Sequence, residues 1–476
     1  MRSTKIVVTL GPASDSPQCI QKLLENGAGV FRLNASHGTQ EEHAMRIERI
    51  RAVSAEVRVH ACILLDLQGP KIRLGRFESG GCYLKTGSVF TITTEEILGN
   101  CERASTNYEA FARDLKPGDF VLLADGSVTL EVLETDGIAA RCAVLSGGSI
   151  GDRKGINLPG VALSIPSLTE KDILDLDFGV RHGVDFIALS FVRKADDPRC
   201  LRAMLDERGA KIPIISKIEK PEAWENLDEI LAESDGVMVA RGDLGVEMPI
   251  EQVPHIQKSM IERARHHGKL VITATQMLES MIANPFPTRA EVSDVANAIY
   301  DGSDAVMLSG ETSVGKYPAE TVTMMARIAA QAESTRHFHV YKDLPPGERC
   351  TYAEIIAAAA YQAAGMAGVA AIAVFTSSGL SARLVSRFRP PVPIFAFTPS
   401  VIAARRLALS YGVHPLLVPE AHSTELMLAQ VDRMVLDRGW LKPGDGVVCM
   451  AGQPTGKSGT TNMLKLHRVG DSQPRS

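Results

Sequence analysis

Cysteine is scarce in this chain of 476 residues, and its eight cysteines stand singly, without a Cys-x-x-Cys pair or a His pair at metal-ligand spacing. Isolated thiols of this kind are typical of a reduced cytosolic protein. An excess of charge of either sign is also missing, because 51 Lys and Arg residues stand against 56 Asp and Glu residues. The net charge of −5 predicts no nucleic-acid partner and no membrane-surface partner. Any anion binding must therefore come from local clusters.

Long hydrophobic runs are absent as well. The first apolar run ends at Gly11-Pro12, which makes it too short for a signal peptide. The most membrane-like stretch, 353–375, is mostly Ala and is interrupted by Glu354 and Gln362. A buried helix followed by a strand explains that stretch better than a membrane span. We therefore expect a cytoplasmic protein without a membrane anchor.

Short runs rich in Val, Ile and Leu alternate with segments of helical periodicity, which is the pattern of βα units around a parallel sheet. The chain is long enough for two to four domains with substantial cores. The runs are 5–10, 30–34, 61–67, 185–191, 213–219, 235–240, 270–274 and 304–309. Eight units in a row predict a closed (β/α)8 TIM barrel, since an open doubly wound sheet would need fewer strands. We assign residues 1–69 and 167–340 to this barrel.

One connection breaks the alternation of strand and helix. Between the third and fourth runs the sequence alternates like strands, as in Val128, Leu130 and Val132, with turn pairs such as Asp125-Gly126. We therefore predict an inserted all-β domain over 70–166 at the carboxyl end of the barrel, in the position of a lid.

A separate C-terminal α/β domain is predicted over 341–476, after a linker that contains Pro345-Pro346-Gly347. Its size lies within the usual range for a domain. The expected strands are 370–376, 394–397, 416–418, 446–450 and 462–467. Helices separate the first four strands, and the fifth strand follows the fourth directly.

Reactive residues of such a barrel lie where its strands end, and these ends are charged or polar. Lys217 and Glu219 are two residues apart on one strand, so their side chains share a face. Glu219 and Asp243 close adjacent strands, and a divalent cation such as Mg²⁺ would relieve the repulsion of two carboxylates. Arg32 and Arg73, together with Lys217, place positive charge at the same opening, as phosphoryl transfer requires.

Several of these features also have a plainer interpretation. Charged strand ends are common because water solvates them, but so many polar ends at one opening favour a functional site. His37 alone is equally well explained as a loop cap. Arg241-Gly242-Asp243 matches a cell-adhesion tripeptide, but three residues match by chance. The segment 451–458 resembles a phosphate loop, yet a strand-like sequence follows it instead of a helix, which argues against nucleotide hydrolysis and leaves a phosphate-binding surface loop.

Eight strings across the barrel resemble the pyruvate kinase family, in family order. They are TKIVVTLGPAS (4–14), FRLNASHG (31–38), LLDLQGPKIR (64–73), KGINLPG (154–160), ISKIEKPEA (215–223), VARGDLGVEMP (239–249), TATQMLESM (273–281) and VMLSGETSVGKYP (306–318). The resemblance implies transfer of the phosphoryl group of phosphoenolpyruvate to ADP in glycolysis, giving pyruvate and ATP. It also implies a cytoplasmic homotetramer.

The same resemblance implies roles for individual residues. Metal ligands would be Glu219 and Asp243, holding Mg²⁺ with Mn²⁺ as an alternative. Catalytic residues would be Lys217, Arg32, Arg73, Thr275, Ser309 and Glu311. Substrate-binding residues would be Arg32, Lys217, Ala240, Arg241, Gly242, Asp243 and Thr275. Nucleotide-binding residues would be Asn34, His37, Arg73 and Lys154.

A monovalent-cation pocket is implied at Asn34, Ser36, Asp66 and Leu67, but the sequence departs from the potassium-requiring members nearby. It has Leu67-Gln68 and Lys71 where those members carry Thr-Lys and Glu. A Lys ammonium has the charge of K⁺, so we expect Lys71 to fill the pocket and turnover to proceed without K⁺. The alternative is that Lys71 is a solvated residue of the lid hinge.

The C-terminal domain resembles the effector domain of the family. A strand-to-helix turn can hold a phosphate at the start of the helix. The expected effector residues are Thr376, Ser377, Ser378, Gly379, Ser381 and Lys457. The expected ligand is a phosphorylated effector, with AMP or a sugar monophosphate favoured over a sugar bisphosphate.

Two other functions remain open from sequence alone. A Mg²⁺-dependent barrel lyase or aldolase acting on a pyruvate enolate would also use Glu219 and Asp243, but it would not need Lys217, Arg32, Arg73 and a lid together. A regulatory binding module that kept the barrel would be expected to have lost at least one of the catalytic residues.

Overall fold

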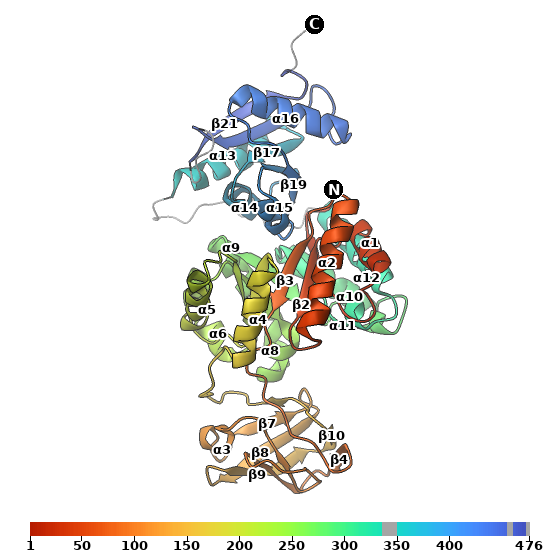
Figure 1. Cartoon of the computed structure of the whole chain (residues 1–476), viewed down its shortest axis with the longest axis vertical. Coiled ribbons are helices and arrows are strands. Elements are labelled where there is room, and N and C mark those ends of the chain that lie inside the picture. The colour runs from red at the N-terminus through yellow and green to blue at the C-terminus, as the bar shows by residue number, and fades with distance from the viewer. Residues whose placement is uncertain (336–349, 455–459, 473–476) are drawn as a thin grey trace.

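Three bodies follow one another along the long axis of the molecule, with the inserted β domain at one end, the barrel in the middle and the C-terminal domain at the other end (Figure 1). The computed structural model describes residues 1–335, 350–454 and 460–472. Within these residues, no helix is long and apolar enough to cross a membrane.

The central body is a closed barrel of eight parallel strands in the order β1-β16-β15-β14-β13-β12-β3-β2. Its strands are β1 (Lys5–Thr9), β2 (Val30–Asn34), β3 (Cys62–Asp66), β12 (Phe186–Leu189), β13 (Ile214–Ile218), β14 (Gly236–Ala240), β15 (Leu270–Ala274) and β16 (Ala305–Leu308). Each strand lies inside one of the eight predicted apolar runs. The predicted (β/α)8 barrel is therefore confirmed.

Helices surround the barrel and begin where the sequence supplies caps. For example, the Ser16 hydroxyl accepts a hydrogen bond from the backbone N–H of Cys19, and Pro17 occupies the first turn of the first helix. The α-helices are α1 (Pro17–Glu25), α2 (Gln40–Glu56), α4 (Glu170–Arg181), α5 (Asp196–Glu207), α6 (Pro221–Glu225), α7 (Leu227–Glu233), α8 (Arg241–Glu247), α9 (Val253–His266), α10 (Arg289–Tyr300), α11 (Gly310–Ser313) and α12 (Pro318–Ser334). Two 3₁₀ turns are η1 (Ile250–Gln252) and η2 (Glu279–Ile282).

The barrel strands are buried on both sides, and alternate residues belong to two different cores. The core inside the barrel includes Val7, Val30, Leu64, Phe186, Ala188, Ile215, Met238, Ile272 and Met307. The core between strands and helices includes Ile6, Val8, Phe31, Leu33, Ile63, Leu65, Ile187, Ile214, Val237 and Val306. Because side chains alternate along a strand, Arg32, Asp66, Ser190, Lys217 and Glu219 continue the inner side toward the carboxyl end.

The inserted domain between β3 and α4 contains a six-stranded sheet, β11-β7-β8-β9-β5-β6, and a two-stranded sheet, β10-β4. Its elements are β4 (Gly81–Leu84), β5 (Val89–Thr93), β6 (Arg103–Ser105), α3 (Phe111–Asp114), β7 (Phe120–Leu123), β8 (Val128–Thr135), β9 (Ala139–Ser146), β10 (Gly148–Gly151) and β11 (Ile156–Asn157). Val128, Leu130 and Val132 are buried in its core, as their alternation predicts. We call this body the lid.

The C-terminal domain is an α/β layer structure with strand order β19-β18-β17-β20-β21, in which only β21 runs antiparallel to its neighbour. Its elements are α13 (Tyr352–Ala367), β17 (Ala371–Phe375), α14 (Leu380–Arg387), β18 (Ile394–Thr398), α15 (Val401–Leu407), β19 (Val413–Leu417), α16 (Thr424–Asp437), β20 (Gly446–Gly452) and β21 (Thr461–Arg468). The predicted α/β domain is confirmed. The largest difference in a boundary is at β19, which begins at Val413, before the apolar residues from which we predicted it.

The C-terminal domain covers the end of the barrel that lies opposite the lid (Figure 1). The Lys5 ammonium, at the start of β1, donates to the carbonyl of Val413 at 2.6 Å. Arg389 pairs with Asp304, just before β16, at 2.9 Å. Leu409 joins the core inside the barrel. The carboxyl ends of the strands therefore remain toward the lid, and we call this end the barrel mouth.

Candidate active site

Two cations and two carboxylates form a buried network at the barrel mouth. Arg32 donates through Nε to Asp66 Oδ2 at 2.7 Å. The Lys217 ammonium lies 3.4 Å from Asp66 Oδ1 and 2.7 Å from Glu219 Oε1. It also donates to the Ser190 hydroxyl at 2.8 Å. The predicted residues Arg32, Lys217 and Glu219 are therefore brought together by β2, β13 and the loop after β13.

The protonation of this network follows from burial and from its own charges. Burial disfavours the Lys217 ammonium, but Asp66, Glu219 and Asp243 outweigh burial and raise the pKa of Lys217 above its ordinary value. Burial would raise the pKa of Asp66, but Lys217 and Arg32 together lower it. Lys217 is therefore a cation at neutral pH, held by an Asp66 carboxylate that stays charged.

Glu219 combines a structural contact with an unfavourable charge. Its Oε2 accepts a hydrogen bond from the backbone N–H of Phe191 at 2.9 Å, which fixes the carboxylate between two strand ends. Burial raises the pKa of Glu219, the Lys217 ammonium opposes this rise, and the Asp243 carboxylate adds to it. A divalent cation bound by oxygen atoms of Glu219 and Asp243 would stabilise both charged carboxylates. These donors fit a hard metal ion.

The segment from Ala240 to Asp243 begins α8 and is fixed by contacts to the end of β15. Arg241 turns away from the mouth, because its guanidinium pairs with Asp294 at 2.6 Å and donates to the carbonyl of Thr275 at 2.6 Å. The backbone N–H of Gly242 donates to the Thr275 hydroxyl at 2.8 Å. Any contact of Arg241 with substrate therefore comes from its backbone.

Thr275 and Gln276 adopt strained backbone conformations at the mouth. Their φ angles are 69° and 52°, in the left-handed region that a β-branched residue such as Thr rarely adopts. Strain of this kind persists where surrounding contacts over-determine it, as at functional sites. The hydroxyl of Thr275 is thereby held against Gly242.

Ser309 and Glu311 follow β16, and their side chains differ in how firmly they are held by hydrogen bonds. Glu311 is fully buried, and its two oxygens accept backbone N–H groups of Leu278 at 3.1 Å and Ser309 at 2.7 Å. The Ser309 hydroxyl is buried and has no hydrogen-bond partner within residues 1–335, 350–454 and 460–472. Of the predicted residues Ser309 and Glu311, Ser309 is therefore the one whose side-chain oxygen has no hydrogen-bond partner among the described residues.

Cations from the barrel and from the lid face each other around His37. Burial lowers the pKa of the His37 imidazole, and the charges of Arg73, Lys71 and Arg32 lower it further. Arg73 lies at the lid hinge, where its guanidinium donates to the carbonyl of Arg153, next to the exposed Lys154. The lid therefore adds positive charge to the barrel mouth, which suits a polyanionic ligand.

The lid also touches the barrel directly. The Asn157 amide, on β11, donates to Glu247 Oε1 at 2.9 Å, and Lys220 reaches the same oxygen at 2.7 Å. A small cavity of about 20 Å³ lies between lid and barrel, and its lining includes Lys71, Asp243 and Glu247. Lys71 of the lid and the predicted metal ligand Asp243 thus line the same gap.

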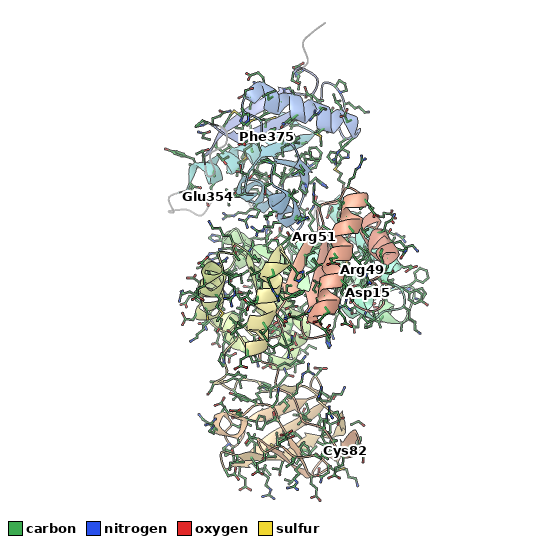
Figure 2. The ribbon with its side chains drawn as sticks, in the orientation of Figure 1. Asp15, Arg49, Arg51, Cys82, Glu354 and Phe375 are labelled. Carbon is green, nitrogen blue, oxygen red and sulfur yellow. The ribbon has the colours of Figure 1, made fainter. Side chains whose placement is uncertain are left out.

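A separate cavity lies in the C-terminal domain. It has a volume of about 630 Å³ and is lined by Thr376, Ser377, Ser378, Leu380, Ser381 and other residues. Phe375, labelled in Figure 2, stacks on Phe397 with ring centroids 4.9 Å apart, and both rings line the cavity.

The predicted effector turn borders this cavity, and it is pinned by its own hydroxyl groups. The Thr376 hydroxyl accepts the N–H of Gly379 at 2.9 Å, and the hydroxyls of Ser381 and Thr461 lie 2.6 Å apart. Gly379 has a φ of 89°, which suits glycine, and itself lies outside the cavity lining. Lys457 lies outside the described residues.

Comparisons with known proteins agree over the whole chain. The family model described as "Pyruvate kinase, barrel domain" matches residues 1–322, and "Pyruvate kinase, alpha/beta domain" matches residues 354–467. The chain belongs to the pyruvate kinase family. It is therefore an enzyme that transfers phosphate.

Relatives in this family match the chain almost from end to end. A pyruvate kinase of Corynebacterium glutamicum is 45% identical over 470 residues, covering 99% of this chain and 98% of the relative. One of Clostridium acetobutylicum is 44% identical over 473 residues, covering 98% and 100%. A crystal structure of a pyruvate kinase from Cryptosporidium parvum superposes with a TM-score of 0.93 at 38% identity, covering 98% of this chain and 96% of that one.

The residues expected to form a monovalent-cation pocket lie at adjoining strand ends. Asn34 and Asp66 are opposite each other in the register of β2 and β3. The Asn34 side chain accepts the backbone N–H of Ser36 at 3.1 Å, and the Leu67 carbonyl accepts the Ser190 hydroxyl at 2.6 Å. These residues are therefore close together, and the Asn34 and Leu67 oxygens already have protein donors.

Two lysines lie near this group of residues. Lys71 lies at the lid hinge beside Gly155, and its charge helps to lower the pKa of His37. Lys171, on α4, donates to the carbonyl of Ala35 at 2.7 Å, between Asn34 and Ser36 in sequence. Sequence reasoning missed Lys171, because it lies in a helix and belongs to no strand end.

Three partners at the barrel mouth were also missed. Ser190 follows β12, and the rule about strand ends would have found it had it been applied to the fourth run. Thr9 ends β1, and its hydroxyl accepts from Arg32 at 3.1 Å. Asp294 lies within α10, so no local signal in the sequence pairs it with Arg241.

Proposed function

We propose that this member of the family transfers the phosphoryl group of phosphoenolpyruvate to ADP, giving pyruvate and ATP. The P–O bond to the enolate oxygen breaks, a P–O bond to the terminal phosphate oxygen of ADP forms, and the enolate then takes a proton on carbon. The observation that carries the proposal is the buried Lys217 ammonium, held between Asp66 and Glu219, with Arg32 beside it.

Lys217 and Arg32 are the phosphoryl-binding cations. Charges fixed before the reaction stabilise negative charge that builds up on the transferring group, and they do so most strongly where water is excluded. Asp66 positions both cations, because its carboxylate oxygens lie 2.7 Å from Arg32 Nε and 3.4 Å from Lys217 Nζ. The substrate carboxylate would bind to the backbone of the segment from Ala240 to Asp243, which includes Gly242.

Mg²⁺, or Mn²⁺ in its place, would be held by Glu219 and Asp243. Such an ion would neutralise negative charge on the substrate. This role is supported by the raised pKa of Glu219. Burial and the Asp243 carboxylate raise this pKa, although the Lys217 ammonium opposes them. A bound cation would offset the cost of the buried negative charge on Glu219. Among the described residues, no cluster of three or more His, Cys, Asp or Glu side chains is placed to hold a metal ion, so substrate and water would complete the shell.

The nucleotide would bind on the lid side of the mouth. Arg73 and Lys154 would contact its phosphates, and Asn34 and His37 would lie beside them. This arrangement is supported by the direction of the His37 pKa, lowered by burial and then by the surrounding cations, because an imidazole kept neutral can accept or donate a hydrogen bond there.

The proton that completes pyruvate would pass along Thr275 and Ser309. The Ser309 hydroxyl has no partner among the described residues, which leaves it free to relay a proton. Glu311 would hold the loop after β16 in place through its two backbone contacts.

The deciding experiment is a steady-state assay in which phosphoenolpyruvate and ADP are mixed with the enzyme and Mg²⁺, and both pyruvate and ATP are measured. Equal amounts of the two products are expected. Release of pyruvate with inorganic phosphate instead of ATP would indicate hydrolysis and would refute the proposal. Formation of neither product would favour a lyase or aldolase that acts on a pyruvate enolate.

The cavity of the C-terminal domain is the proposed site of an activating phosphorylated metabolite. Its hydroxyl-bearing turn suits a phosphate, and the wall formed by Phe375 and Phe397 suits a base or sugar ring. AMP and a sugar monophosphate are therefore the favoured candidates. Titrating each candidate, with a sugar bisphosphate for comparison, against the substrate saturation curve tests this role, and no shift with any of them would refute it.

We further propose turnover without K⁺, a homotetrameric assembly and a cytoplasmic role in glycolysis. The assembly and the location rest on membership of the family. Light scattering after size-exclusion chromatography tests the assembly, and a mass other than four times 51.3 kDa would contradict it.

A further inference from the structure

Two cysteines meet on the edge of the lid, away from the barrel mouth. Cys82 lies in β4 and is half-buried, whereas Cys101 is exposed in the turn before β6. Figure 2 shows Cys82 on the outer flank of the lid. The Cys82 thiol donates to the carbonyl of Asn100, the residue before Cys101, at 3.4 Å. The Cys101 thiol is close enough to help raise the pKa of Cys82.

Both sides of this contact are anchored by the backbone. Cys82 is paired with Ile150 of β10 in the two-stranded sheet. On the other side, the Asn100 side chain accepts the N–H groups of Glu102 at 2.9 Å and Arg103 at 3.1 Å, which makes a tight turn around Cys101. The contact between the thiols therefore follows from the fold and not from two mobile chain ends.

We propose that Cys82 and Cys101 are a redox modification site, in which a peroxide oxidises the pair to an intramolecular disulfide that thiols reverse. Such a bond requires Cβ atoms about 3.5–4.5 Å apart. Cys101 lies in a bend outside any strand, so it can move toward β4 without breaking the sheet. Neither residue belongs to the proposed catalytic or effector site.

The reaction balances with hydrogen peroxide as the oxidant. The exposed sulfur of Cys101 attacks one peroxide oxygen, the O–O bond breaks, and Cys101 becomes a sulfenic acid while water leaves. The Cys82 sulfur then attacks the Cys101 sulfur, forming the S–S bond and breaking the S–O bond, and a second water carries away the Cys82 proton. Two electrons pass from the thiols to the peroxide, and a reducing thiol returns them by exchange.

The two thiols have different roles for physical reasons. Cys101 is the one that peroxide in solvent reaches first. Burial, followed by the contact with Cys101, raises the pKa of Cys82 to about 11, so Cys82 is a neutral thiol that waits as the resolving partner. The second step should accordingly become faster as the pH rises.

The disulfide would join β4 to the turn at Asn100 and so fasten the flank of the lid. The strand β10, paired with β4, leads into Asp152, whose side chain accepts the N–H of Phe77 at 2.7 Å. The cross-link thus closes a loop within the lid and reduces the conformational freedom of the lid when it is unfolded. The expected effect is a lid that resists cleavage, with little change at the barrel mouth.

The test treats the reduced full-length protein with excess hydrogen peroxide, alkylates the remaining thiols and maps the peptides by mass spectrometry. A peptide containing Cys82 linked to one containing Cys101, released by dithiothreitol, is expected. Cys200 is the internal control, because it is exposed on α5; it should collect sulfenic and sulfinic acid instead of a disulfide.

Single variants separate the two steps. Cys82→Ser should leave the sulfenic acid of Cys101 to be trapped by dimedone, and Cys101→Ser should leave Cys82 unlinked. Oxidised wild-type protein should withstand limited proteolysis of the lid several-fold longer than reduced protein, whereas oxidised Cys82→Ser should not. The proposal is overturned if Cys101 is over-oxidised as fast as Cys200 with no linked peptide, or if linkage occurs only between molecules. Because no readout uses turnover, the result is independent of the proposed function.

Discussion

At the scale of single residues, the barrel mouth depends on where Lys217 places its charge. Replacing it in Lys217→Met removes the cation that faces the transferring phosphoryl group, and turnover should fall roughly 100- to 1,000-fold. The variant also leaves Asp66 and Glu219 buried without their partner, so the melting temperature should fall. Steady-state kinetics and thermal unfolding measure the two effects.

Lys220→Met is the matched control for that variant. Lys220 is also largely buried and pairs with a carboxylate, Glu247, at 2.7 Å, so its removal should cost similar stability. It makes no contact with Asp66 or Arg32 in the described structure, and its turnover should fall much less. Near-normal turnover of Lys217→Met, or equal losses in both variants, would refute the assigned role of Lys217.

Lys71 carries the proposed independence from K⁺. Lys71→Glu replaces a cation by an anion at the lid hinge, so turnover without K⁺ should fall roughly 10- to 100-fold and should recover when K⁺ is added, since the added cation restores the missing charge. The rates are compared in potassium and sodium salts. Lys116→Glu, with the same charge change at an exposed lid position, should show no potassium dependence. A wild-type enzyme that itself needs K⁺ would contradict the proposal.

Residues that end predicted strands could be found from the sequence, whereas their partners could not. Lys217 and Glu219 follow from period-two spacing at the end of an apolar run. Asp294 lies in the interior of a helix, and its pairing with Arg241 at 2.6 Å depends on how that helix packs. The contact of Cys82 with Cys101 likewise joins a strand to a turn, and no spacing rule predicts it.

At the scale of elements, the connection from β3 into the lid passes close to the loop after β12. Gly69 has a φ of 68°, and a Cβ there would lie 2.7 Å from Phe191 Cδ2. The N–H of Phe191 binds Glu219, so Gly69→Ala should displace that carboxylate. We expect lower kcat and a higher Mg²⁺ requirement, measured by titrating the metal in the assay.

Gly160→Ala provides the comparison on the return path from the lid. Gly160 has a φ of 71°, but a Cβ there meets nothing within 4 Å. Both variants should lose about 1–2 kcal/mol of stability from backbone strain. Only Gly69→Ala should lose activity; equal kcat values would show that the contact with Phe191 does not matter.

Element boundaries were predictable where apolar runs are continuous. All eight barrel strands are buried on both faces, so their sequences are mostly apolar and their limits are clear. β19 is different, because His414 and Pro415 interrupt its apolar pattern and only the parallel pairing with β18 extends it back to Val413. Tertiary pairing, which a local pattern does not contain, sets that boundary.

At the scale of the whole molecule, a net charge of −5 conceals a division of charge between the two ends of the barrel. The mouth gathers Arg32, Lys71, Arg73 and Lys217 toward the lid. The opposite end holds a second set of charges, where Lys5 and Asp304 meet the C-terminal domain. A proposed effector in that domain must act through this second contact, because the domain lies across the barrel from the mouth (Figure 1).

The contact at Lys5 gives the stability of the molecule a predictable pH dependence. Burial, and after it the charge of Arg2, lower the pKa of the Lys5 ammonium to about 7, although Glu333 and Asp304 oppose the shift. Above pH 7 the folded protein therefore loses a proton that the unfolded chain keeps up to its ordinary pKa of 10.5. Since the unfolded state binds more protons in this window, stability should rise with pH, by at most about 1.4 kcal/mol per pH unit.

Urea unfolding at a series of pH values between 7 and 9 measures this slope, with Lys5→Met as the variant. Lys5→Met also loses the hydrogen bond to Val413, which changes the stability at every pH but adds no slope. The variant should therefore be flatter than wild type, while Lys22→Met, at an exposed position on α1, should keep the wild-type slope. If wild type and Lys5→Met rise equally between pH 7 and 9, the ammonium is not losing its proton at the interface. The C-terminal domain would then be docked on a charged Lys5.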